Sequence, residues 1–168
     1  EPAQYAVAGV LRPGNAPATR GARGLLRRLL RKLRAAFRGA TYRVRLDGGF
    51  AHPKLFQFLE QQQVEYVVAM ASNRRLEKRA RRLMGKARMQ SKATGQTAHL
   101  YGETRYAARS WKRKRRVIIK AEVVRHPGRD PKNNPRFVVT NLAGTPEDVY
   151  KFYCGRGDVE NRLKELHH

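Results

Sequence analysis

Acidic residues are scarce in this chain. Its 168 residues include 13 Asp and Glu against 37 Lys and Arg, which gives a formal net charge of +24. A charge this large opposes compaction by self-repulsion unless a polyanion neutralises it. Nucleic acid is the partner that fits best. An anionic membrane surface and a purely solubilising role for the charge are the weaker alternatives.

Cysteine is nearly absent too, since Cys154 is the only one. An internal disulfide and a cysteine-based zinc cluster are therefore excluded. We interpret Cys154 as a small buried packing residue rather than a nucleophile. No hydrophobic run approaches the roughly 18 residues of a membrane span, and the first residues do not resemble a signal peptide. Because the chain begins with Glu1 rather than Met, we expect it to be part of a longer protein.

The basic residues are concentrated in two parts of the chain. Residues 1–46 carry 11 basic residues and one acid, residues 72–120 carry 17 and two, and residues 121–168 carry eight and seven. Three basic segments are therefore expected to follow a nucleic-acid backbone, namely 20–38, 74–92 and 109–116. Because 40% of the residues are hydrophobic, the chain can still bury the core of a single domain.

The hydrophobic pattern predicts strands and helices in alternation. Period-two runs and short apolar runs predict strands at 4–11, 41–47, 64–71, 97–108, 117–124 and 137–142. Helical spacing predicts helices at 22–37, 53–63 and 73–92, and from Pro146 to the end of the chain. The first of these helices is basic and amphipathic, with leucines that either pack on a sheet or meet a membrane or partner. The order of elements predicts an α/β domain with helices against a sheet.

The last predicted helix carries four polar side chains on one narrow stripe. At about 100° per residue, Tyr153, Arg156, Glu160 and Lys164 fall within roughly 80° of one another. The carboxylate of Glu160 is thereby set among a phenol and two cations, which suits metal-assisted phosphoryl transfer on a nucleic acid. The plainer interpretation of Glu160 is an i,i+4 ion pair with Lys164 on a helix surface.

Asp47 is the second candidate acid, because it ends a predicted strand beside two glycines. If folding brings Asp47 and Glu160 together, their hard oxygen atoms can hold Mg²⁺ or Mn²⁺. Spacing alone supports this pair only weakly. An ion pair with Arg45, or a cap for the following turn, is the alternative for Asp47.

Three motifs in order carry a resemblance to a known family. They are Leu46-Asp47-Gly-Gly-Phe50, the segment from Asn134 to Asn141, and Tyr153-x2-Arg156-x3-Glu160. Together they resemble bacterial insertion-sequence transposases of the DDE type, in the group whose catalytic glutamate lies in a Tyr-x2-Arg-x3-Glu-x6-Lys helix. The resemblance covers essentially the whole chain.

The resemblance implies one RNase H-like α/β domain over residues 1–168. Its mixed sheet is flanked by helices, with a mostly β insertion (residues 93–143) before the last catalytic helix. The implied activity is Mg²⁺- or Mn²⁺-dependent cleavage of transposon ends, followed by strand transfer into a target DNA duplex. The implied protein is cytoplasmic, associated with the bacterial nucleoid when bound to DNA, and a homodimer in the end complex.

The resemblance also implies roles for single residues. Asp47 resembles the second acid of the catalytic triad and Glu160 the third, so both would bind the metal. Tyr153 and Arg156 resemble the pair that grips a phosphate. The final lysine of the motif would fall at His167, and Lys164 is the nearest substitute. Nothing in residues 1–46 matches the first aspartate, so we expect that residue to precede this chain and the fragment to lack full activity.

Trp111 is the only tryptophan and lies within a run of cations. Stacking on an exposed DNA base is one interpretation of Trp111, and packing against the inserted sheet is the other. The remaining predicted DNA contacts are Arg74, Arg75, Arg113, Lys114 and Arg115. The rival function is a non-catalytic nucleic-acid-binding remnant of a transposase, and a third is a basic membrane-surface protein.

Overall fold

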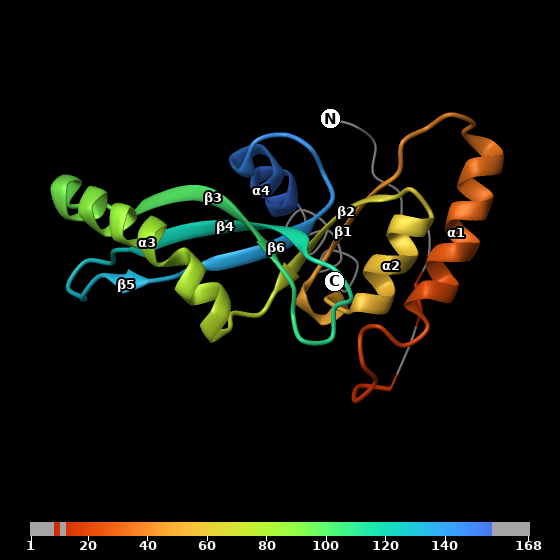
Figure 1. Cartoon of the computed structure of the whole chain (residues 1–168), viewed down its shortest axis with the longest axis horizontal. Helices are drawn as coiled ribbons and strands as arrows, with labels where there is room; N and C mark the ends of the chain where they lie inside the picture. The colour runs from red at the N-terminus through yellow and green to blue at the C-terminus, as the bar shows by residue number, and fades with distance from the viewer. Residues whose placement is uncertain (1–8, 11–12, 156–168) are drawn as a thin grey trace, which may run out of the picture.

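The computed structural model describes residues 9–10 and 13–155, which form one mixed sheet with helices on both faces (Figure 1). The strands are β1 (Arg43–Leu46), β2 (Glu65–Met70), β3 (Ala98–Tyr106), β4 (Arg115–Val124), β5 (Lys132–Asn133) and β6 (Arg136–Thr140). Their order is β1-β2-β6-β4-β3, and β5 pairs with β4. β1 and β2 are parallel, and the other pairs are antiparallel. The predicted α/β class is confirmed.

The helices are α1 (Ala22–Ala36), the short 3-10 helix η1 (Gly48–Phe50), α2 (Pro53–Gln61), α3 (Arg74–Thr94) and α4 (Pro146–Cys154). Each of the longer helices begins within one residue of its predicted start. Thr145 caps α4, since its side chain accepts a hydrogen bond from the backbone N–H of Asp148, three residues on. The strand predicted at 4–11 lies mostly outside the described residues. Gly9 and Val10, the two of its residues that are described, are exposed and not in a strand.

The strands bury different side chains on the two faces of the sheet. In β2, Tyr66 and Val68 join a large core with α2 and α3, whereas Val67 between them joins a smaller core with α4. The same alternation places Val139 in the large core and Val138 in the small one. A strand with both faces buried reads as a nearly continuous apolar run, as residues 64–71 do apart from Glu65.

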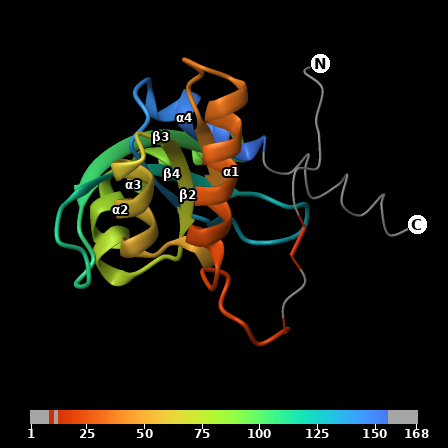
Figure 2. The same ribbon diagram turned by 90° about the vertical axis from the view of Figure 1, so that its right-hand side faces the viewer.

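Helix α1 forms an outer layer beside α2, as Figure 2 shows. The guanidinium of Arg27 lies 5.7 Å from the ring centre of Phe58 on α2. Leu30 reaches the large core, but it is the only one of the predicted leucines that is fully buried. Phe37, which follows the leucines at helical spacing, is 60% exposed. Packing of the leucines into the core is thus seen for Leu30, with Leu26 partly buried against it, whereas the end of the helix at Phe37 is exposed.

Residues 93–143 do not form a separate sheet. Strands β3, β4 and β6 continue the sheet begun by β1 and β2, with β6 paired to β2 over Val67–Met70. The status of this segment as an insertion stays a prediction. In the part of the chain that the structure describes, no helix is long and apolar enough to cross a membrane.

Candidate active site

Asp47 stands at the end of β1, where the chain turns into η1. Its carboxylate oxygen Oδ1 accepts a hydrogen bond of 2.9 Å from the backbone N–H of Gly49. A Cβ atom on Gly49 would lie 3.1 Å from that oxygen and 2.9 Å from the Cβ of Ala18. Glycine is therefore needed for the close turn, and the turn fixes the direction of the Asp47 side chain. Asp47 thus caps the turn, as one of its predicted alternatives had it.

Arg45, two residues before Asp47 on β1, joins this strand to the end of α4. Its Nη1 donates a hydrogen bond of 3.1 Å to the backbone carbonyl of Phe152, and its guanidinium lies 5.0 Å from the centre of the Phe152 ring. A Cβ atom on Gly155 would collide with the same Nη1. The strand that carries Asp47 and the turn that carries Tyr153 are thereby held together, although 107 residues separate Arg45 from Phe152.

Tyr153 belongs to an aromatic cluster on the α4 face of the sheet. Its ring centre lies 5.9 Å from that of Tyr150, which in turn lies 5.6 Å from Tyr101 on β3. The ammonium of Lys120 is 5.7 Å from the centre of the Tyr150 ring. Burial raises the pKa of the Tyr150 phenol, so that side chain stays neutral and acts as packing. This cluster fixes the end of α4 from the side opposite to Arg45.

The remaining residues of the predicted stripe, Arg156, Glu160 and Lys164, lie outside the described residues. Within residues 9–10 and 13–155, no group of three His, Cys, Asp or Glu side chains could hold a metal ion. Asp47 supplies hard oxygen atoms of the kind that Mg²⁺ and Mn²⁺ prefer. The side chain of Asp47 therefore fits a metal ligand chemically, as one member of a larger set.

Trp111 and Arg115, two of the predicted DNA contacts, are buried in the structure. Trp111 is 9% exposed and packs edge-on against Phe56 and Tyr106, so its ring faces are not open to a DNA base. Packing in the core was the alternative interpretation, and the structure favours it. Arg115 is 6% exposed, and its guanidinium lies 5.3 Å from the ring centres of both Phe56 and Trp111.

The carboxylate of Glu60 on α2 holds this buried arginine. It accepts hydrogen bonds of 2.8 and 2.9 Å from Arg115, one from Arg113, and one of 2.9 Å from the hydroxyl of Tyr66. Burial by itself raises the pKa of Glu60, but these hydrogen bonds together outweigh it and lower the pKa below 4.5. For Tyr66, burial and then the nearby carboxylate raise the pKa of the phenol. The cluster attaches the β3–β4 loop (residues 107–114) to α2.

The other predicted DNA contacts lie on the surface. Arg74, Arg75 and Lys114 are exposed, and Arg113 is 62% exposed in its side chain while it pairs with Glu60. Helix α3 packs on the sheet through a stripe of small and apolar residues, Leu76, Ala80, Met84, Ala87 and Ser91. Its nine basic side chains are all exposed, so one whole side of the helix is cationic.

Three residues of the site differ from the sequence expectation. Cys154 is exposed rather than buried, because α4 packs through Val149 and Tyr150 and turns Cys154 outward. Glu60 was not singled out, and Arg45 was named only as a possible ion-pair partner of Asp47, not for its contact with α4. An isolated arginine in a basic strand gives no local signal, and Glu60 sits in a helix where a surface position is the default. The residues that Arg45 and Glu60 contact, Phe152 and Arg115, are also far from them in the sequence.

A mixed sheet with helices on both faces and an aspartate at a strand end defines the arrangement expected of an RNase H-like DDE domain. The family model for the transposase DDE domain, group 1, matches residues 3–168. The chain therefore belongs to this family of transposases. No curated protein and no solved structure matches it in the corresponding comparisons.

Proposed function

We propose that this domain cleaves DNA at transposon ends with a divalent metal and joins the freed end to a target duplex. The observation that carries the proposal is the junction between β1 and α4. Asp47 ends β1, and Arg45 of the same strand holds the residue before Tyr153. Family membership over residues 3–168 supports the same reaction.

In this proposal Asp47 and Glu160 hold the metal, Mg²⁺ or Mn²⁺. The metal, when bound, would activate the attacking oxygen and stabilise charge on the scissile phosphate. Tyr153 and Arg156 grip a neighbouring phosphate, and Lys164 adds a positive charge four residues after Glu160 in the sequence. The protein would contribute positioning and charge stabilisation, with no covalent protein–DNA bond.

The basic side of α3 supports DNA as the partner. Arg74 and Arg75 begin it, and only Glu77 adds an acid to the helix. The cationic face would follow the phosphate backbone, with an affinity that falls steeply as salt rises. A homodimer that brings two ends together, and a location on the bacterial nucleoid, belong to the same proposal.

Substitution of each acid in the transposase that contains this sequence tests the proposal. We expect Asp47→Ala and Glu160→Ala each to abolish Mg²⁺-dependent cleavage of end-containing DNA while DNA binding persists. Glu65→Ala is the matched control, because Glu65 is a partly exposed carboxylate on β2 that pairs with Arg43. Cleavage that persists in either acid variant contradicts the assignment. If the unmutated protein binds DNA without cleaving it, the non-catalytic alternative is favoured.

A further inference from the structure

Two neighbouring cavities share one wall along helix α2. The first has a volume of about 770 Å³ and extends from α2 to the β3–β4 loop. The second has a volume of about 340 Å³ and extends from α2 to α1. Their shared residues are Lys54, Gln57 and Gln61, which recur at helical spacing on one side of α2. The two cavities adjoin along these side chains, and we call the surface that they form together the α2 groove.

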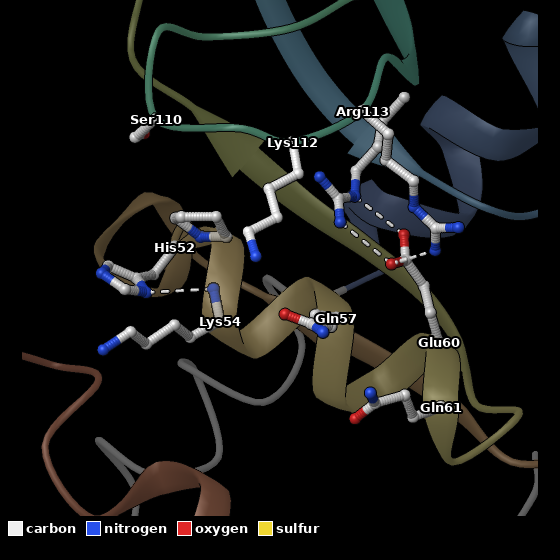
Figure 3. Close-up of a pocket in the computed structure, with 10 residues that line it drawn as sticks. His52, Lys54, Gln57, Glu60, Gln61, Ser110, Lys112 and Arg113 are labelled. Carbon is white, nitrogen blue, oxygen red and sulfur yellow. Dashed lines mark hydrogen bonds and ion pairs between the residues drawn. The ribbon is translucent and has the colours of Figure 1, made fainter.

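The walls of the α2 groove are cationic on both sides. Arg23 and Arg27 of α1 line one wall, and Lys112 and Arg113 of the β3–β4 loop line the other. Figure 3 shows Lys112 extending from the loop toward α2, with Gln57 on the helix below.

Lys54 adds a further cation on the floor of the α2 groove. Glu60 is the only acid among the lining residues, and its carboxylate is already shared by the guanidinium groups of Arg113 and Arg115. A net positive charge is left for a ligand.

We propose that the α2 groove binds the sugar–phosphate backbone of duplex DNA without reading its sequence. Cations and side-chain amides are the groups that contact phosphate oxygens. Among the lining residues, Phe58 is the only Phe, Tyr or Trp; it is 6% exposed and lies against Arg27, so no open Phe, Tyr or Trp ring is available in the groove for stacking bases.

The α2 groove gives the domain a DNA-binding site apart from α3. Helix α3 lies toward the opposite end of the sheet from α1 in Figure 1. Helix α2 begins at Pro53, six residues after Asp47, so a backbone held in the groove approaches the turn that carries this acid. That the ligand is DNA rests on the proposed function, whereas the binding of a phosphate backbone rests on the charge of the groove itself.

A metal-free binding experiment on the full 168-residue chain tests the α2 groove. The variant Lys54→Gln/Lys112→Gln removes two cations from it, and Arg129→Gln/Lys132→Gln removes two exposed cations from the β4–β6 connection as the control. With EDTA present and a 20-base-pair duplex of arbitrary sequence, we expect the groove variant to lose at least about tenfold in affinity at 0.1 M salt. We also expect its log–log salt slope to fall by about two. Both changes should be absent or much smaller in the control.

A second measurement on the unmutated protein does not depend on the folding of a variant. Acetylation of lysines by an amine-reactive reagent, read by mass spectrometry, should slow at Lys54 and Lys112 when duplex DNA is added, and stay unchanged at Lys132. Equal losses of affinity in both double variants, or no protection of Lys54 and Lys112, overturn the proposal. So does a groove variant that binds DNA normally but loses binding to vesicles of phosphatidylcholine and phosphatidylserine. Because no cleavage is measured, these outcomes are separate from failure of the proposed catalysis.

Discussion

At the scale of single residues, the carboxylate of Glu60 holds three neighbouring side chains in place, since it accepts hydrogen bonds from Arg113, Arg115 and Tyr66. It pairs with the buried Arg115, whose Nη1 has no hydrogen-bond partner among the described residues. Removing the carboxylate would leave that guanidinium buried without a counter-charge, which costs far more than the loss of an exposed ion pair. The sequence around Glu60 gave no sign of this, because the burial that makes the pair important arises only when the β3–β4 loop folds onto α2.

Glu60→Gln is expected to lower the free energy of unfolding by about 3 kcal/mol near neutral pH. The pKa of Glu60 is lowered in the folded protein, so its stabilisation is present above pH 4.5 and is lost as the pH falls through the folded pKa. The variant should therefore lose less stability than the parent on acidification below pH 4.5. Urea unfolding at several pH values measures both effects.

The control for this prediction is Glu147→Gln, which removes an exposed i,i+4 pair with Lys151 on α4. We expect a change below about 0.5 kcal/mol there. A similar loss in both variants, or an unchanged acid dependence for Glu60→Gln, would show that the Glu60 cluster does not stabilise the fold.

At the scale of elements, the contact between β1 and α4 is the feature that brings the two candidate motifs together. The strand, its alternation and the capped start of α4 could be predicted from residues 41–47 and from Thr145 and Pro146, because these signals are local. The contact between Arg45 and α4 could not be predicted, since Arg45 donates to a backbone carbonyl. Every residue has such a carbonyl, so the sequence does not mark which one accepts the hydrogen bond. The position of α1 in an outer layer beside α2 could not be predicted either, because the spacing of its leucines is the same whether the helix packs on a sheet or on another helix.

Gly155→Ala tests this contact between elements. The new methyl group would displace the Arg45 guanidinium, which then loses its hydrogen bond to Phe152 and its position over the ring. We expect a loss of about 1.5 kcal/mol in the free energy of unfolding. Amide hydrogens in the last turn of α4 should also exchange faster with solvent.

Two comparisons show whether Arg45 carries the Gly155 effect. In an Arg45→Ala background, Gly155→Ala should no longer destabilise the protein, since the colliding group is gone. Gly24→Ala on α1 is the control glycine, because a Cβ there meets nothing within 4 Å and should stabilise the helix by about 0.5–1 kcal/mol. A loss that is equal in both backgrounds contradicts the role of Arg45.

At the scale of the whole molecule, composition indicates the kind of partner, whereas the fold decides which cations are available to it. The net charge of +24 favours a nucleic acid wherever the cations lie. Which cations are available depends on the fold: Arg74 and Arg75 are exposed as predicted, whereas Arg115 is taken into the core with Trp111. Residues 109–116 read as one basic run in the sequence, but strand β4 begins inside it at Arg115, which is buried, and the loop before the strand buries Trp111.

Asp47→Cys tests most directly whether Asp47 is a metal ligand in a DNA transposase. A thiolate is a poor ligand for Mg²⁺, whereas Mn²⁺ accepts sulfur more readily. In the transposase that contains this sequence, cleavage of transposon ends by Asp47→Cys should fall at least about a hundredfold in Mg²⁺. Mn²⁺ should restore part of that activity, but should not restore Asp47→Ala. Full activity of the cysteine variant in Mg²⁺, or equal recovery of both variants in Mn²⁺, would contradict metal binding by Asp47.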